Sequence, residues 1–326
     1  MEAVYHLDAW YDANRHLFDP PVCNKLMHKK QLSVMFVGGP NTRTDFHLDQ
    51  GSEFFWMVRG NMELPTIQKG KRKVVKIREG EVFCLPSRVP HSPQRPEKGS
   101  LGLVVERERY IKGEFGIKTP ELDGLRWFVD FENTNGSDIL WEKYFHCYDL
   151  GRDLVPVVKE YHASEEKKTM VPSATSVLDD ATRPFKVDTT TEVPDPFNLQ
   201  EWIDRNKEAL QATPGGLDLF RHEGGSHPDG EFTVLVCGCP GTQAFDPWAG
   251  DTWVFQLKGS CDVAMNGEKN PTNAQQLLER VGGVVPPNTP FNISRGEGSL
   301  GFVVRCDPRG NKSPEDLEDG EKKQRT

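Results

Sequence analysis

Two histidines and a carboxylate are the residues of this sequence whose types and spacing suggest chemistry. His47 and Glu53 stand close together, and His91 follows a short apolar run that ends in proline. Imidazole nitrogen and carboxylate oxygen, without a thiolate, suit a divalent iron and leave coordination positions open for a substrate and dioxygen. Zinc also accepts three such ligands with one water. The residues therefore predict a metal site, and their spacing alone leaves both metals possible.

Short runs rich in valine, leucine, phenylalanine and methionine surround these residues and predict β-strands. Turn residues separate the runs at close spacing, which is typical of an all-β sandwich or barrel. In the first half the predicted strands cover residues 31–38, 53–58, 73–78, 81–85 and 101–106. An aromatic-rich stretch over 123–150 is expected to seal one face of this barrel.

The same β pattern returns in the second half, where strands are predicted over 231–238, 252–257, 281–285 and 300–306. Apolar residues at helical spacing predict helices over 2–18 and 198–210. A polar stretch from about 162 to 196 is expected to act as a linker, and the charged segment 311–326 as a disordered tail.

The two β regions form an internal repeat. Residues 51–60 match 250–259, residues 85–91 match 285–291, and residues 99–106 match 298–305 without gaps. Where the first copy has His47, Glu53, His91 and Glu106, the second has Asp246, Thr252, Phe291 and Arg305; Arg95 keeps a counterpart in Arg295. A barrel can be built without the His/Glu/His set, so that set serves a purpose other than folding.

Composition excludes several classes of function. The formal net charge is −9, and no basic stripe suits a nucleic-acid partner. No apolar run approaches the ~18 residues that cross a membrane, and the first residues lack a secretory signal pattern. The seven cysteines are scattered and odd in number, unlike a disulfide framework. We therefore expect a cytosolic protein without nucleic-acid or membrane partners.

Longer motifs of this sequence resemble those of a known family. Glu53-x6-Gly60 and Gly80-x5-Pro86-x4-His91 are similar to the two cupin motifs, with Asp45 in place of the first histidine of the usual His-x-His. Together with the segments 21–27, 38–43, 89–95 and 102–107, they resemble the 3-hydroxyanthranilate 3,4-dioxygenase family. The resemblance is nearly continuous from residue 7 to 158 and weaker beyond.

The resemblance implies an all-β chain of two cupin, jelly-roll-like barrels with a few flanking helices. It implies a non-haem Fe(II) extradiol-type dioxygenase of the kynurenine pathway. With O2 such an enzyme opens the ring of 3-hydroxyanthranilate to 2-amino-3-carboxymuconate semialdehyde, the precursor of quinolinate and so of NAD.

The resemblance also assigns residues. His47, Glu53 and His91 would bind Fe(2+), with Glu53 also facing the substrate. Arg95 would receive the substrate carboxylate, Glu106 would face its amino group, and Arg43 would lie near dioxygen. Asn24 and Asp45 would belong to the pocket. A planar guanidinium offers a carboxylate two parallel donors, which agrees with the role of Arg95.

These expectations divide the chain into a catalytic cupin domain (1–162), a polar linker (163–181), a degenerate, metal-free cupin domain (182–310) and the tail (311–326). A monomer is expected. Cys306 lacks neighbouring cysteines, so no second metal site is predicted. The alternative is a non-redox, metal-binding cupin that binds a small carboxylated metabolite. A ligand site in the second barrel also stays open.

Overall fold

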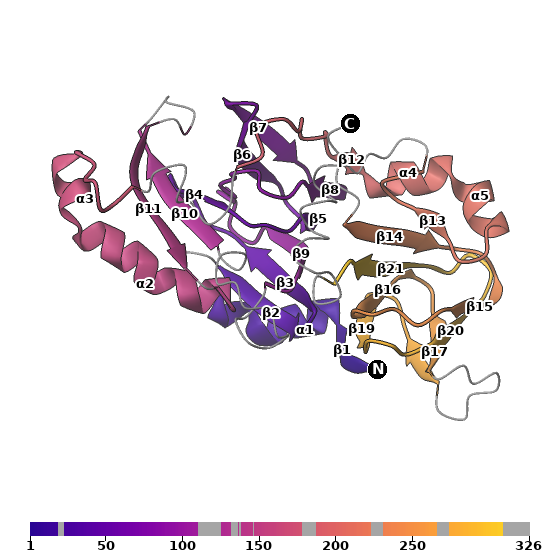
Figure 1. Ribbon diagram of the computed structural model, residues 1–326. Helices are drawn as coiled ribbons and strands as arrows, with labels where there is room; N and C mark the ends of the chain where they lie inside the picture. Colours follow the sequence, from indigo (N-terminus) through magenta and orange to yellow (C-terminus); the bar gives the residue numbers. More distant parts are fainter. Residues whose placement is uncertain are drawn as a thin grey trace. The chain divides into compact units, whose positions relative to one another are not determined.

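The computed structural model describes residues 1–18, 23–109, 125–131, 136, 138–145, 147–177, 187–222, 231–265 and 274–308 (Figure 1). The predicted tail and residues 178–181 of the predicted linker lie outside these ranges. The chain forms two compact units. We call Leu17–Leu26 with Met35–Phe197 the first-barrel unit, and Met1–His16, Met27–Val34 and Asn198–Thr326 the second-barrel unit.

Facing antiparallel sheets build the first-barrel unit. One sheet has the order β12-β8-β5-β9-β3-β2, and the others are β11-β10-β4 and the hairpin β6-β7. Apolar side chains of β3, β5, β8 and β9 pack against those of β6 and β7 in one core. The strands are β2 (Asn24–Lys29), β3 (Leu32–Gly38), β4 (Phe46–Leu48), β5 (Glu53–Arg59), β6 (Met62–Gln68), β7 (Lys71–Ile77), β8 (Glu81–Leu85), β9 (Leu101–Arg107), β10 (Leu125–Asp130), β11 (Ile139–Phe145) and β12 (Phe197–Asn198).

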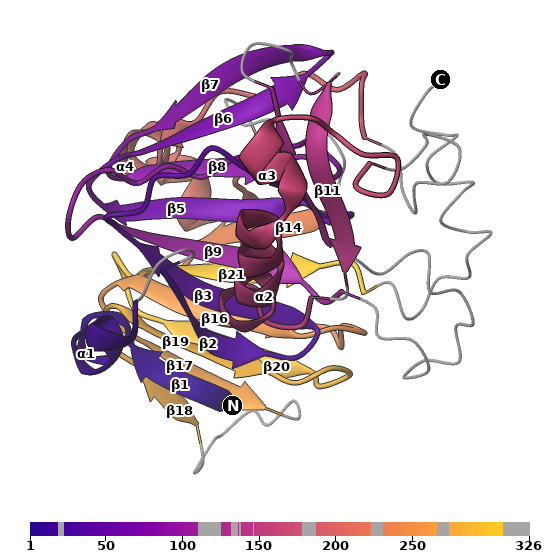
Figure 2. The same ribbon diagram turned by 90° about the vertical axis from the view of Figure 1, so that its left-hand side faces the viewer.

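Helix α2 (Leu150–Ala163) covers the sheet β11-β10-β4 of this unit, as Figure 2 shows. Asp149 caps it by accepting a hydrogen bond from the backbone N–H of Gly151. The buried face of α2 packs on Trp127 and Trp141 of β10 and β11, which lie edge to face. The aromatic-rich stretch thus forms a sheet and its cover, and the short helix α3 (Glu165–Thr169) follows.

The second-barrel unit repeats the two-sheet plan. A sheet in the order β1-β19-β16-β21-β14-β13 faces one in the order β15-β20-β17-β18, with a shared apolar core. Its strands are β1 (Glu2–His6), β13 (Leu217–Asp218), β14 (Phe232–Cys237), β15 (Gly241–Phe245), β16 (Thr252–Lys258), β17 (Cys261–Met265), β18 (Gln275–Leu277), β19 (Val281–Val285), β20 (Phe291–Arg295) and β21 (Leu300–Cys306). The helices are α1 (Leu7–Asn14), the 3-10 turn η1 (Arg15–Leu17), α4 (Leu199–Arg205) and α5 (Lys207–Ala212).

The sequence repeat is a structural repeat. Strand β5 lies between β8 and β9, and its counterpart β16 lies between β19 and β21, all antiparallel. Both central strands carry an irregularity at the same place, before Arg59 and Lys258. Gly60 and Gly259, which follow, both have positive φ, a conformation that glycine adopts without strain. The prediction of an all-β, two-barrel chain is confirmed.

The beginning of the chain differs from the prediction. Residues 2–6 form strand β1, which pairs with β19, and only Leu7–Asn14 are α-helical. His6 marks the change, because its side chain accepts a hydrogen bond from Ala9 N. Pairing with a distant strand overrides the helical spacing of the apolar residues. This segment also belongs to the second-barrel unit, whereas it was predicted within 1–162.

The division between the units also lies elsewhere than expected. The first-barrel unit continues to Phe197, instead of ending near residue 162. Val193 is buried in the first barrel's core, and its N–H donates to Gln68. Within the predicted linker, α3 is helical, and the buried Ser176 accepts a backbone hydrogen bond from Glu142. These contacts attach the polar stretch to the first barrel.

No helix in the described part of the chain is long and apolar enough to span a membrane.

Candidate metal centre and substrate pocket

The two histidines and the glutamate come together inside the first-barrel unit. His47 lies in the middle of β4, and Glu53 begins β5. His91 follows β8 and is tied to His47 by a pair of backbone hydrogen bonds of 2.8 and 2.9 Å. One ligand atom from each side chain lies within 4.8 Å of the others, and all three residues are buried. They form a metal-binding triad.

The environment of His91 fits a metal. Its Nδ1 donates to the carbonyl oxygen of Val89 at 3.0 Å, which leaves Nε2 to act as a ligand. That Nε2 is buried without a hydrogen bond and lies 3.1 Å from Oε1 of Glu53. A cation bound by this nitrogen and this carboxylate oxygen would satisfy both buried groups.

The two imidazoles have opposite pKa shifts. Burial opposes the charged form of His91, but the Glu53 carboxylate outweighs it and the pKa of His91 is raised. Burial, together with His91 and Arg43, holds the pKa of His47 well below its usual value. His47 is therefore neutral near pH 7, the form in which imidazole binds a metal.

Arg43 lies beside the triad and is held there by Asp45. Its Nη2 is 2.9 Å from Oδ2 of Asp45 and 3.2 Å from Nδ1 of His47. The same Oδ2 accepts a hydrogen bond from the indole N–H of Trp127 at 2.7 Å. Asp45 does not line the pocket. The structure therefore places Arg43 at the site and Asp45 behind it.

Arg95 brings a fully buried positive charge to the pocket. Its Nη2 donates to the Met62 sulfur at 3.4 Å, and its Nε is buried without a hydrogen bond. Burial, followed by the nearby Arg43, lowers its pKa to about 10, so it stays charged near pH 7. Among the residues that the structure describes, no carboxylate forms an ion pair with Arg95. It is placed to receive an anionic ligand.

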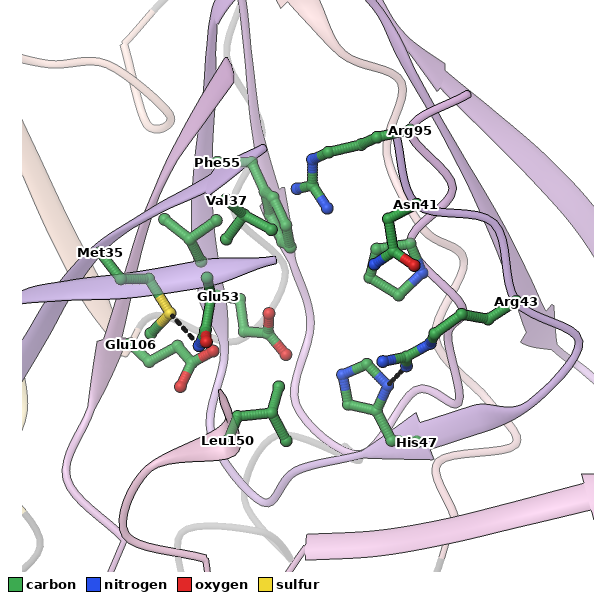
Figure 3. A pocket seen from close by; sticks show the side chains of 13 residues that line it. Met35, Val37, Asn41, Arg43, His47, Glu53, Phe55, Arg95, Glu106 and Leu150 are labelled. Carbon is green, nitrogen blue, oxygen red and sulfur yellow. Dashed lines mark hydrogen bonds between the residues drawn. The ribbon is translucent and has the colours of Figure 1, made fainter. Parts of the chain in front are cut away.

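The pocket has a basic and an acidic wall. Figure 3 shows Arg95, Asn41 and Arg43 on one side and Glu53 and Glu106 on the other. It encloses about 400 Å³ of space, part of it open to solvent. The lining residues are Asn24, Met35, Val37, Asn41, Arg43, His47, Glu53, Phe55, Pro93, Arg95, Val104, Glu106 and Leu150. A ligand that carries both an anionic group and a hydrogen-bond donor suits such a pocket.

Six of the eight predicted site residues line this pocket, and the exceptions are Asp45 and the triad member His91. Asn24 contributes through β2, where its side-chain amide lies 3.6 Å from the sulfur of Met35. The sequence did not point to Asn41 or Leu150. Asn41 lies within the glycine- and proline-containing segment before Arg43, which was a usable signal, whereas Leu150 reaches the pocket only because α2 begins there.

In the second-barrel unit an arginine takes the corresponding place. Nε of Arg305 donates to Oγ1 of Thr252 at 3.0 Å, and its Nη2 donates to the carbonyl oxygen of Asp246 at 3.1 Å. Its guanidinium carbon is 5.8 Å from the centre of the Phe291 ring. These three residues are the counterparts of the metal-binding triad. A guanidinium therefore lies where the first barrel gathers its ligands.

Comparison with known proteins identifies the family. A family model described as 3-hydroxyanthranilic acid dioxygenase matches residues 1–162. The 3-hydroxyanthranilate 3,4-dioxygenase of Bos taurus is 40% identical over 314 residues, which cover 96% of this chain and 99% of the bovine protein. This chain belongs to the 3-hydroxyanthranilate 3,4-dioxygenase family. The resemblance seen in the sequence is confirmed.

Other members of the family match over similar lengths. The enzyme of the same name from Nematostella vectensis is 40% identical over 93% of this chain and 99% of its own length. The one from Homo sapiens is 39% identical over 94% of this chain and 98% of its own. Among solved structures, tomato vicilin aligns with a TM-score of 0.42 and 11% identity, covering 88% of this chain and 82% of vicilin.

Proposed function

We propose that this protein opens the ring of 3-hydroxyanthranilate with O2 at a ferrous ion, producing 2-amino-3-carboxymuconate semialdehyde. The product leads to quinolinate and NAD in the kynurenine pathway. The observation that carries the proposal is a metal-binding triad, two of whose members, His47 and Glu53, line the same pocket as the buried, charged Arg95. Membership of a family whose named relatives are 3-hydroxyanthranilate 3,4-dioxygenases supports the choice of substrate.

Fe(2+) is the metal that we assign to His47, Glu53 and His91. Two imidazoles and one carboxylate form a donor set that suits non-haem iron and leaves roughly three of six octahedral positions free. When bound, the iron would allow electrons to pass from the aromatic ring to dioxygen. Zinc, which carries out no redox chemistry, is the alternative ion for the same donors.

The protein's own residues orient the substrate. Arg95 pairs with the carboxylate through parallel N–H donors, inside a site where burial strengthens the interaction. The neighbouring amino and hydroxyl groups then face the acidic wall and the metal-binding triad. Glu106 accepts a hydrogen bond from the amino group or takes up a proton there. Phe55 and Val104 are apolar parts of the lining that the flat ring contacts.

Arg43 supplies positive charge where oxygen reacts. It lies 3.2 Å from His47 and is fixed by Asp45, so its guanidinium needs little rearrangement during the reaction. Negative charge that develops on dioxygen is stabilised by such a preorganised cation. Arg43 and Glu106 are the residues that we propose as catalytic, and Asn24 as a further contact of the substrate.

The test is direct. Ferrous-loaded protein mixed with 3-hydroxyanthranilate in air should consume oxygen and develop the absorbance of the semialdehyde. Arg95→Ala should raise KM strongly, since the substrate carboxylate loses its partner. Binding without turnover, when iron occupancy has been verified, would instead favour a non-redox metal-binding cupin.

The remaining assignments are proposals of the same kind. We assign catalysis to the first barrel. We assign no metal to the second barrel, because Arg305 lies among the residues that correspond to the metal-binding triad. We further propose that the protein is a monomer in the cytosol. Light scattering of the purified protein tests whether it is a monomer, and cell fractionation tests whether it lies in the cytosol.

A further inference from the structure

A buried arginine outside the pocket contacts one of the residues that line it. Arg109 follows β9, and its side chain is only 5% exposed. Its Nη2 donates to Oε2 of Glu106 at 2.8 Å, and its Nε lies 2.5 Å from Oδ2 of Asp49. Arg109 does not line the pocket itself. It therefore acts on the site through Glu106.

The charges around Arg109 explain why Glu106 needs support. Glu106 and Glu53 are directly paired across β9 and β5, so two carboxylates lie side by side. Asp49 brings a third carboxylate to the same region. Carboxylates this close repel one another, and Arg109 is the guanidinium that contacts two of them. Burial opposes its charge, but Asp49 and Glu106 outweigh it and keep the pKa of Arg109 well above its usual value.

A carboxylate in such a place has two possible uses. If it turned toward the triad, the Glu106 carboxylate would coordinate the metal. If it is held at the acidic wall, it faces the molecule bound in the pocket. The ligand atoms of His47, Glu53 and His91 gather within 4.8 Å of one another, and Glu106 is not part of that group. Glu106 accepts a hydrogen bond from Arg109, which does not line the pocket, and this bond restrains the carboxylate at the wall.

We propose that Arg109 is a positioning residue that fixes the Glu106 carboxylate at the acidic wall and so makes the pocket select ligands with an amino group next to their carboxylate. The geometry behind this is an ordered series of contacts: Asp49 holds Arg109, Arg109 holds Glu106, and Glu106 faces Arg95 across the pocket. The inference rests on the proposed function, because the amino group belongs to the proposed substrate.

The test compares two ligands that differ only in the amino group. Metal-loaded protein is titrated without oxygen, by calorimetry, with 3-hydroxyanthranilate and with 3-hydroxybenzoate. The ratio of the two dissociation constants measures selection for the amino group. In Arg109→Gln this ratio should fall roughly tenfold, the size expected when a charge-assisted hydrogen bond is lost. Binding of 3-hydroxybenzoate should change little.

Arg126→Gln is the matched control. Arg126 is also buried in the first-barrel unit, where its Nε donates to Glu142 at 2.8 Å, but neither residue lines the pocket. It should lose stability as Arg109→Gln does and keep the wild-type ratio. Arg109→Lys should lower the ratio about threefold, because an ammonium lacks the guanidinium fork that spans two carboxylates.

A folded Arg109→Gln variant with the wild-type ratio overturns the proposal, and so does an equal loss in Arg126→Gln. If Arg109→Gln does not fold, as judged by circular dichroism, Arg109→Lys decides: a reduced ratio supports the positioning role, and an unchanged ratio refutes it. Failure of the proposed function is separate, since the wild-type protein would then show no turnover and no preference for the amino compound.

Discussion

Asp45 shows how one residue sets the position of others. Its Oδ2 forms an ion pair with Nη2 of Arg43 and accepts a hydrogen bond from the indole N–H of Trp127. It therefore connects a residue of the pocket to strand β10. Sequence comparison with the usual cupin motif presents Asp45 as a lost metal ligand. In the structure the same residue anchors the cation that lies beside His47.

Asp45→Asn should therefore reduce catalysis more than stability. The amide oxygen can still accept from Trp127, but the charge that holds Arg43 is lost, and we expect kcat to fall roughly tenfold with little change in KM or in metal content. Steady-state kinetics and metal analysis measure this. Trp127→Phe, which removes the indole hydrogen bond and part of the buried ring but keeps the Asp45 charge, should lower the melting temperature and leave kcat near the wild-type value. Equal kcat values for the two variants would contradict the role of Asp45.

At the scale of elements, the start of α2 brings a helix to the edge of the substrate pocket. Leu150 lines the pocket, and a Cβ added to Gly151 would lie 2.4 Å from Oδ1 of Asn24. The glycine allows the helix and the pocket residue to approach closely. The position of Asn24 and the beginning of α2 therefore depend on each other.

Gly151→Ala should have opposite effects on stability and on binding. Alanine favours a helix by up to about 1 kcal/mol over glycine, but its methyl group must displace the Asn24 side chain, so we expect KM to rise several-fold. Kinetics and thermal unfolding measure both effects. Gly296→Ala is the control, because no atom lies within 4 Å of the added Cβ. An unchanged KM in Gly151→Ala would show that Asn24 is not needed for binding.

The elements around the triad were predicted unevenly, for physical reasons. Strands β8, β19 and β21 have the predicted bounds, because apolar runs bounded by glycine and proline are local signals. Strand β4, which carries His47, is only three residues long and owes its existence to pairing with β10. Helix α2 contains Pro156 and was not predicted. Such elements depend on contacts made elsewhere in the fold.

The three metal-ligand candidates could be chosen from the sequence, whereas the contacts around them could not. Ligand types and the repeat identified His47, Glu53 and His91 without any structure, because the second copy lacks all three. The partner of a charged side chain is not encoded in spacing. Nothing in the sequence indicated that Arg109 contacts Glu106, since that contact depends on the path of the chain after β9.

For the whole molecule, the repeat predicts one metal per chain. Elemental analysis of purified protein should give a ratio near one, and His91→Ala should reduce it close to zero. Phe291→Ala, which changes the counterpart residue in the second barrel, should leave it at one, because Arg305 already lies among the corresponding positions. Two metals per chain would refute this account of Arg305.

Both units should lose stability at alkaline pH. Burial raises the pKa of the Cys147 thiol in the first unit and of the Cys237 thiol in the second to about 12. Above the usual thiol pKa the unfolded chain releases these protons while the folded protein keeps them, so the free energy of unfolding falls as pH rises toward 12, by roughly 1.4 kcal/mol per pH unit for each thiol.

Urea unfolding between pH 8 and 11 measures this slope. Cys147→Ala should reduce the slope by the contribution of one thiol, whatever it does to stability at pH 8. An identical slope in wild type and Cys147→Ala would exclude the linkage.

Strand β1 has a consequence for the order of folding. It is synthesised before the other strands that the structure describes, yet its partner β19 is synthesised only after all the strands of the first barrel. Strand β1 must wait unpaired until β19 has been made, and closing so long a loop is entropically costly. During biosynthesis the first barrel can form its core without β1, whereas the sheet that contains β19 is completed only when β1 pairs with it.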